Sequence, residues 1–206
     1  GVKRIPKKLR GYAEALGVGI PVKPGDLIVR GSWFALDTAG FCTVPVKAPL
    51  QMSPSCGAVY HWLEDYKSLF VLPGMAECIA RVETHPPYRC AGKEARSFCP
   101  SGNPALERLF NALLSDDLCM IPWGESVPAP LPPFPHFSAV VCGTNIVRGI
   151  ARLLQMELIP VAGATGDIDT NLAAKAAAAL RAAETYPFVL LHINGADEAA
   201  HRLCPV

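Results

Sequence analysis

Apolar residues in the first half of the chain cluster into short runs separated by turn residues. Residues 27–30 and 33–36 read as one strand or two, and residues 69–72 as another. Runs of this length, rich in Val, Ile, Phe and Trp and bounded by Gly or Pro, are typical of β-strands. We therefore predict that this half is rich in short strands.

One amphipathic helix interrupts this pattern. Asn103 is a favourable N-cap residue, and Pro104 suits the first helical turn. Apolar residues recur after it at helical spacing, at Leu106, Leu109, Phe110, Leu113 and Leu114. Together with the strands, this helix predicts a mixed α+β module.

The second half alternates between helical and strand-like segments. In order, we predict a short strand or helix lead-in at 139–142, a helix at 145–155, a strand at 157–160, an alanine-rich helix at 171–185 and a strand at 188–193. Asp169 or Thr170 is available to cap the second helix. The last run is apolar throughout, as in a strand covered on both faces. This order predicts a parallel sheet in an α/β core.

Proline marks the change between the two halves. Six prolines fall between Ile121 and Phe137. Because proline fixes φ and lacks an N–H donor, residues 128–135 must form an extended connection. We place a domain boundary there, with one domain over 1–137 and a second over 138–206.

Composition narrows the class of protein. The chain has 206 residues, is 50% hydrophobic and carries a formal net charge of +1. A net charge this small does not indicate the strongly cationic surface with which proteins bind nucleic acids or anionic membranes. We therefore expect neither a nucleic acid nor a membrane as a partner. The basic amino end is followed by a poor signal-peptide core, and no apolar stretch reaches a spanning length. We expect a soluble, cytoplasmic protein.

The eight cysteines form no C-x-x-C pair. We expect reduced, mostly buried thiols, because a stapled secreted scaffold is denser in cysteine. A metal site could be assembled on paper from His85, Cys78, Cys90 and Cys99, but buried thiols are the simpler interpretation.

Asp197 and His201 form the sharpest chemical pattern. If a helix begins near Asp197, the two side chains lie one turn apart and could share a divalent ion such as Mn²⁺ or Zn²⁺. Spacing alone favours an N-capping aspartate and an exposed histidine. The glycine turn 163–166 could bind an anion at a helix N-terminus, or be only a tight turn.

Four further residues carry interpretations. Arg30 ends an apolar run, where its guanidinium could bind a carboxylate or phosphate. Arg148 and Arg152 are four apart on a predicted helix, a spacing more typical of a solvated face. His192 lies within an apolar run and is expected to be a hydrogen-bonded core histidine.

In combination, these segments resemble a family. Residues 146–154, Val161-Ala-Gly-Ala-Thr-Gly-Asp-Ile-Asp-Thr-Asn171 and 188–193 with Asp197-Glu-Ala-Ala-His201 occur in the order of the archaeal-type, cofactor-independent phosphoglycerate mutases, relatives of alkaline phosphatase. Residues 12–20, 23–26 and Arg30 are similar to the entry into that family's inserted lid, and Trp123-Gly124 with 131–134 to a later stretch.

The resemblance implies a partial parallel-sheet, phosphatase-like α/β core with an α+β inserted lid (substrate cap). It implies interconversion of 3- and 2-phosphoglycerate, a phosphorylated small-molecule acid, through a phosphoserine with two divalent ions (Mn²⁺, Mg²⁺ or Zn²⁺). Asp197 and His201 would be ligands of one ion, and Arg30 and Arg148 would bind substrate. Unpaired strand edges would favour a homo-oligomer.

Departures from the family pattern limit the expected activity. The family's first aspartate ligand and nucleophilic serine would precede Gly1, and its remaining ligands would follow Val206. The catalytic residue is thus unknown within these residues, and we expect negligible mutase activity from the chain alone. Ala200 replaces a glycine, and 44–47 replaces an arginine-rich stretch. Alternatives are a related phosphotransferase, such as one acting on homoserine, or a non-catalytic binding fragment.

Overall fold

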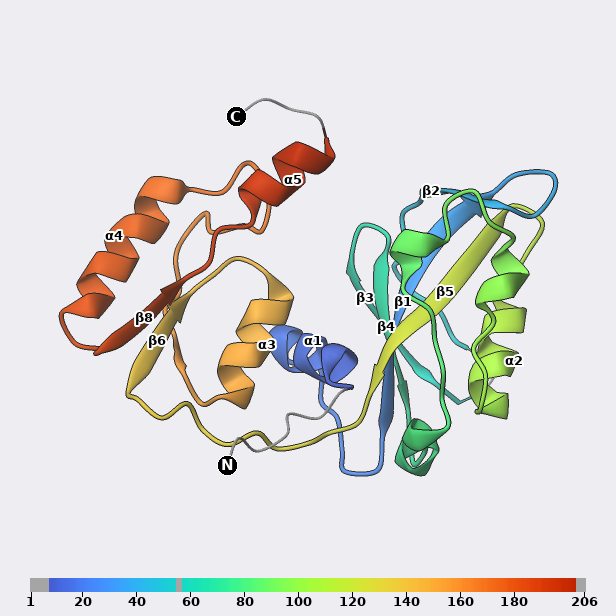
Figure 1. Cartoon of the computed structure of the whole chain (residues 1–206), viewed down its shortest axis with the longest axis horizontal. Coiled ribbons are helices and arrows are strands. Elements are labelled where there is room, and N and C mark those ends of the chain that lie inside the picture. Colours follow the sequence, from blue (N-terminus) through green and yellow to red (C-terminus); the bar gives the residue numbers. More distant parts are fainter. Residues whose placement is uncertain (1–7, 55–56, 203–206) are drawn as a thin grey trace. The chain divides into compact units, whose positions relative to one another are not determined.

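The computed structural model describes residues 8–54 and 57–202, without the His201 side chain. These residues divide into two units (Figure 1). The first unit contains Val22–Ala129 and the residues up to Tyr12, and the second contains Ala13–Pro21 and the residues from Pro130 onward. The division at Ala129 precedes the predicted boundary at 137. It also assigns Ala13–Pro21 to the C-terminal unit, which a boundary drawn by composition alone could not do.

An antiparallel sheet of five strands forms the first unit. Its elements are β1 (Leu27–Leu36), β2 (Cys42–Pro45), β3 (Val59–Glu64), β4 (Lys67–Leu72), β5 (Leu118–Ser126), α2 (Pro104–Ala112) and the 3₁₀ turns Ala76–Ala80, Pro87–Arg89 and Ala95–Phe98. The strand order is β2-β1-β4-β3, and β5 pairs with β1. A mixed α+β module is therefore confirmed.

Strand β1 is the centre of this sheet. The two predicted runs, 27–30 and 33–36, join into one strand that pairs with β2, β4 and β5. All of its residues from Leu27 to Phe34 are buried. Arg30 consequently lies inside the strand and not at its end, which corrects the sequence-based placement.

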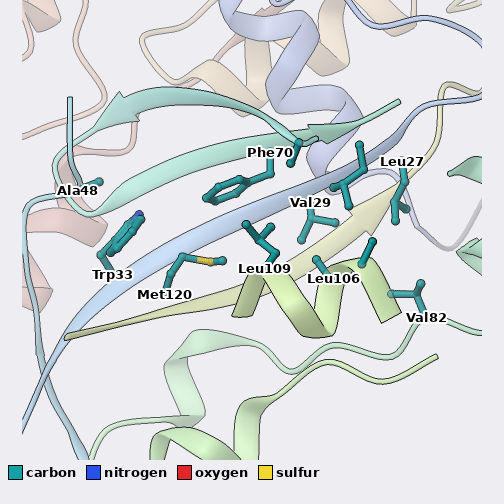
Figure 2. Packing of buried hydrophobic residues seen from close by; sticks show 12 residues of the cluster. Leu27, Val29, Trp33, Ala48, Phe70, Val82, Leu106, Leu109 and Met120 are labelled. Carbon is teal, nitrogen blue, oxygen red and sulfur yellow. The ribbon is translucent and has the colours of Figure 1, made fainter. Parts of the chain in front are cut away.

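Helix α2 closes the apolar face of the sheet. Figure 2 shows Leu106 and Leu109 of this helix beneath Val29 and Phe70 of the strands, with Met120 beside Leu109. All five side chains are at most 1% exposed. Burying them stabilises the unit by roughly 2 kcal/mol per side chain before the entropy cost.

The cap of α2 gives a direct stability prediction. The Asn103 side-chain oxygen accepts hydrogen bonds from the N–H groups of Ala105 (2.9 Å) and Leu106 (3.2 Å). Asn103→Ala removes both bonds at a buried position and is expected to lower the free energy of unfolding by about 1–2 kcal/mol. Urea unfolding followed by tryptophan fluorescence measures this change. An unchanged midpoint would show that the cap contributes nothing.

A parallel sheet forms the second unit, as predicted. Its order is β7-β6-β8, and both pairings are parallel. The elements are β6 (Ser138–Val141), α3 (Asn145–Leu153), β7 (Glu157–Leu158), α4 (Leu172–Ala183), β8 (Phe188–Leu191) and α5 (Gly195–His201). The proline-rich connection before β6 contains no helix or strand. Across the described ranges, no helix has the length and apolar character needed to cross a membrane.

Helix α1 (Arg10–Val18) contributes its residues from Ala13 to this second unit. It lies beside α3 (Figure 1), and two glycines permit the approach. A Cβ on Gly149 would lie 1.6 Å from the Ala13 carbonyl oxygen, and one on Gly17 would lie 1.9 Å from that of Asn145. This close packing is why an N-terminal segment belongs to the C-terminal unit.

Two sequence-based details are wrong in this unit. Helix α4 is capped by Asn171, whose side chain accepts from the Ala174 N–H at 2.9 Å, and not by Asp169 or Thr170. Strand β8 is not covered on both faces: Phe188 and Leu190 are each 39% exposed. Successive residues of a strand point to opposite faces of the sheet. The face that carries Val189 and Leu191 is therefore the more buried one.

Candidate functional site

Arg30 of β1 lies against the indole ring of Trp123 in β5. The two residues are register partners in the antiparallel β1–β5 pair. The guanidinium carbon lies 4.4 Å from the ring centroid, and Arg30 is 3% exposed. The indole N–H donates to the Ser32 hydroxyl at 3.0 Å, which holds the ring in place. A cation–π contact in such a buried setting contributes on the order of 1–2 kcal/mol.

A bulge in β5 produces this arrangement. Between the pairs Ile28↔Ser126 and Arg30↔Trp123, β5 contains one residue more than β1. Gly124 in this stretch has a φ of +64°, a conformation that suits glycine. A Cβ there would also press on the Arg10 side chain at 3.1 Å. The bulge thus brings Trp123 opposite Arg30 and leaves room for a second arginine.

Arg10 is that second cation. Its guanidinium carbon lies 5.3 Å from the centroid of the same Trp123 ring. Two guanidinium groups that share one aromatic ring are held in nearly fixed positions, and planar guanidinium groups are suited to bidentate binding of phosphate or carboxylate. This arginine–tryptophan cluster, Arg10, Arg30 and Trp123, is the candidate anion-binding feature of the first unit.

Arg148 and Arg152 differ in their surroundings although both lie on α3. Arg152 donates to the Leu16 carbonyl oxygen. Arg148 is half-buried and lies within electrostatic range of Cys142, the residue that follows β6. The spacing of four residues therefore does not make them a single solvated pair. Arg148 lies at the carboxyl end of the parallel sheet, the edge where open α/β sheets bind ligands.

The glycine turn 163–166 uses its own polar groups. The Thr165 N–H donates to the Thr170 hydroxyl at 3.1 Å, and the Thr165 hydroxyl donates to Asp169 at 2.6 Å. These internal bonds and the neighbouring carboxylate make the turn a poor anion site. The interpretation as a tight turn before a capped helix is favoured.

Asp197 and His201 both lie on α5, which begins at Gly195, two residues earlier than the predicted start. Asp197 is exposed, and its N–H donates to the Asn194 carbonyl oxygen. The His201 side chain lies outside the described part of the structure. Among the described residues, no three His, Cys, Asp or Glu side chains gather into a group that could hold a metal ion. The assignment of this pair as metal ligands stays a proposal.

Three of the six described free cysteines, Cys42, Cys90 and Cys119, are buried beside one another in the first unit. The sulfurs of Cys42 and Cys119 are 3.6 Å apart. Burial raises the pKa of Cys42 and Cys119, and raises that of Cys90 to about 12. Because the thiolate is the reactive species, this trio is suited to packing and not to nucleophilic chemistry. Cys56 and Cys204 lie outside the described residues.

The buried thiols should therefore react slowly in the folded chain. With iodoacetamide at neutral pH, we expect Cys42, Cys90 and Cys119 to be alkylated at least about tenfold more slowly than after unfolding in urea. Peptide mass spectrometry resolves each site, and the less buried Cys78 serves as the internal reference. Equal rates for all four thiols would contradict the packing described here.

Sequence reasoning missed Lys175 and misjudged His192. Lys175 lies on α4 in register with the buried Ala178 and Ala182, and only 1% of it is exposed. Ala178 and Ala182 follow Lys175 by three and seven residues, which places all three on the same apolar face of the helix. This spacing is the sequence signal that could have indicated the burial of Lys175. His192 Nδ1 is buried without a hydrogen-bond partner among the described residues, so the histidine is not the fully bonded core residue expected.

Comparisons with known proteins give a consistent result. No family model matches the chain. A 2,3-bisphosphoglycerate-independent phosphoglycerate mutase of Methanococcus vannielii is 25% identical over 235 aligned positions, which cover 93% of this chain and 57% of that protein. One from Methanocaldococcus jannaschii is 27% identical with the same coverages. One from Methanococcus aeolicus is 51% identical over 63 residues, 31% of this chain and 16% of that protein.

Among solved structures, the PH0037 protein from Pyrococcus horikoshii is similar with a TM-score of 0.57 and 20% sequence identity. The match covers 93% of this chain and 53% of the Pyrococcus horikoshii chain. This likeness concerns the fold, which is a mixed arrangement of sheets and helices. The chain spans 57% of the length of the first two mutases named above.

Proposed function

We propose that this chain, a homologue of the archaeal cofactor-independent phosphoglycerate mutases over 93% of its length, is part of an enzyme that interconverts 3- and 2-phosphoglycerate. The extent of that alignment carries the proposal, because it runs through both units and not through one shared motif. Each relative named above is a phosphoglycerate mutase, hence an isomerase. The substrate would be a phosphorylated small acid, handled in the cytoplasm.

We assign the two units to different parts of the enzyme. The first, built on an antiparallel sheet, would be the inserted lid, and the second, with its parallel sheet, would be part of the phosphatase-like core. The different sheet types of the two units support this division. Ligands of α/β cores bind at the carboxyl ends of parallel strands. Arg148 and Asp197 both follow strands of that sheet.

Arg30 would bind the substrate from the first unit. Phosphoglycerate carries a phosphate and a carboxylate, and each accepts two parallel hydrogen bonds from a guanidinium group. Trp123 restricts the guanidinium of Arg30 by stacking against it, so less freedom is lost on binding. Arg148 would supply a further positive charge at the edge of the core sheet.

Two divalent ions are implied by the resemblance, with Asp197 and His201 as ligands of one. When bound, such ions would activate the nucleophilic serine and stabilise charge on the transferred phosphoryl group. Within residues 8–54 and 57–202, the side chains do not form a complete ligand set. We therefore derive no step through the ions.

An assay of the whole gene product tests the proposed function. The protein encoded by the complete reading frame and the 206-residue chain are each incubated with 3-phosphoglycerate and Mn²⁺, and 2-phosphoglycerate is detected through enolase. We expect turnover by the product of the complete frame and none by the chain alone. Robust turnover by the chain would contradict the assigned site, and inactivity of the complete product towards 3-phosphoglycerate would contradict the mutase assignment.

Arg30→Lys provides a sharper test within the chain. We expect it to weaken binding of 3-phosphoglycerate by about tenfold, because lysine cannot donate a bidentate pair or stack on Trp123. Isothermal titration calorimetry measures the dissociation constant. Arg89→Lys is the matched control, since Arg89 lies 5.7 Å over the Tyr88 ring at an exposed position of the same unit. Equal losses in both variants would remove Arg30 from the site.

A further inference from the structure

Asn194 and Gly195, which join β8 to α5, are the only asparagine–glycine pair in the sequence. The backbone nitrogen of a residue can attack the side-chain amide of a preceding asparagine, and glycine, which has no Cβ, obstructs this attack least. Within the described ranges the Gly195 N–H donates no hydrogen bond, because the first N–H groups of a helix have no acceptor inside it. The attacking nitrogen is therefore not held by a bond of its own.

The folded chain holds the other partner of this reaction, the Asn194 side chain, by two hydrogen bonds. Its amide nitrogen donates to the Gly166 carbonyl oxygen at 3.0 Å and to a Glu198 carboxylate oxygen at 3.3 Å. The Asn194 carbonyl oxygen in turn accepts from the N–H groups of Asp197 at 3.0 Å and Glu198 at 3.3 Å. These four bonds keep the amide and the first turn of α5 in place.

The backbone of Asn194 must also rotate before the attack can occur. Its φ of −104° and ψ of −12° belong to the helical region. At this ψ the Gly195 nitrogen eclipses the backbone nitrogen of Asn194, whereas closure of a five-membered ring requires it to eclipse the Asn194 Cβ. The rotation breaks the first turn of α5, a helix of seven residues, and short terminal helices open at little cost.

We propose that Asn194 is a site of spontaneous deamidation, gated by the opening of the first turn of α5. The Gly195 nitrogen forms a bond to the side-chain carbonyl carbon of Asn194, its proton passes to the departing amide nitrogen, and ammonia leaves. Water then opens the cyclic imide at either of its two carbonyl carbons, which gives aspartate or isoaspartate. Each conversion consumes a water molecule and releases an ammonia molecule, so the step needs no oxidant or reductant.

The modification replaces an attractive contact with a repulsive one. A carboxylate at position 194 cannot donate to the Gly166 carbonyl oxygen, and it lies beside the Glu198 carboxylate, which has the same charge. The ion pair of Arg202 with Asp167, at 2.5 Å, remains to hold α5. Deamidation thus loosens α5 from the preceding glycine turn. The inference does not depend on the mutase assignment, because it uses only the chemistry of this pair and its hydrogen bonds.

Incubation of the 206-residue chain in mildly alkaline buffer, followed by peptide mass spectrometry, tests the site. We expect Asn194 to be converted with time to both aspartate and isoaspartate, with release of ammonia. Asn111 is the internal reference, because it is exposed on α2 but is followed by alanine. Its conversion should be at least about tenfold slower, since it lacks the following glycine.

Two variants separate the gating from the chemistry of the pair. Glu198→Ala removes one bond to the departing amide and should speed the conversion of Asn194 about three- to tenfold. Glu184→Ala, the matched control, removes an exposed carboxylate beyond the end of α4 and should change the rate by less than about twofold. Gly195→Ala should slow the conversion about tenfold in urea, where the folded structure no longer contributes. Circular dichroism verifies that each variant is folded before urea is added.

Three outcomes overturn the proposal. The first is an unchanged Asn194 in the folded chain after an incubation about a hundredfold longer than the urea-unfolded chain needs. The second is equal conversion of Gly195→Ala and wild type in urea, and the third is equal conversion of Glu198→Ala and Glu184→Ala in the folded state. Asn194→Asp reproduces one product, and in this variant we expect peptides of α5 to exchange their amide hydrogens several-fold faster.

Discussion

Gly149→Ala is expected to destabilise the second unit by about 3 kcal/mol or more. The added methyl carbon would lie 1.6 Å from the Ala13 carbonyl oxygen and 2.5 Å from its carbon, both of which are backbone atoms. Neither atom can move aside without shifting α1 away from α3. Overpacking at a backbone contact belongs to the small class of substitutions with large effects, and it exceeds the gain in helix propensity from glycine to alanine.

Hydrogen exchange read by mass spectrometry measures this effect unit by unit. We expect peptides from α1 and α3 to lose protection in the variant, together with a lower midpoint of urea unfolding by circular dichroism. Ile150→Ala is the matched control, since Ile150 is the next residue on α3 and is 40% exposed; its effect should stay within about 0.5 kcal/mol. Wild-type protection in Gly149→Ala would show that α1 and α3 are not in close contact.

Lys175→Met is expected to raise the free energy of unfolding by about 2 kcal/mol, because Lys175 is 1% exposed and its Nζ has no hydrogen-bond partner among the described residues. Methionine has a similar length and leaves no buried charge, and replacing buried charged groups with apolar ones is often stabilising by 1–4 kcal/mol. Burial lowers the pKa of Lys175 below its ordinary value of 10.5, and Cys142 opposes this shift. The same burial is the source of the stability penalty.

The stabilisation should depend on pH in one direction. Because the folded pKa lies below 10.5, the wild type bears the full penalty at pH values below the folded pKa and loses it as pH rises towards 10.5. The gap between Lys175→Met and wild type should therefore narrow on raising the pH. Urea unfolding at a series of pH values measures it, with Arg181→Met as the control. A gap that widens with pH, or a destabilised variant, would contradict the burial of a charged lysine.

Local signals predicted several elements well. Helix α2 begins where Asn103 and Pro104 indicate, because capping and the first turn depend on neighbours in sequence. The parallel sheet of the second unit followed from the order of its segments, since a helix between two strands imposes a crossover. The helix start depends on neighbours in sequence, and the parallel sheet depends on the order in which its helices and strands follow one another.

Strand β5 was missed because its own sequence disfavours a central strand. Pro122 lacks an N–H donor and Gly124 lacks a side chain, and both residue types are uncommon within central strands, so the local pattern did not predict a strand here. Among the described strands β5 pairs with β1 alone, so it is an edge strand, and an edge strand tolerates a proline. The contact between Arg30 and Trp123 joins residues far apart in sequence, so no local pattern could reveal it.

The amino-acid sequence by itself determined helix α2, the alternation of helices and strands that makes the second half a parallel-sheet unit, and which relatives the chain has, because these follow from periodicity, capping and residue identity. Only the tertiary structure decided that Trp123 stacks on Arg30, that residues from Ala13 belong with the C-terminal unit, and that Lys175 is buried at the sheet edge. The physical reason is that burial and cross-strand register are set by long-range packing. A residue's solvation, and with it its charge and chemistry, is therefore known only once its distant neighbours are in place.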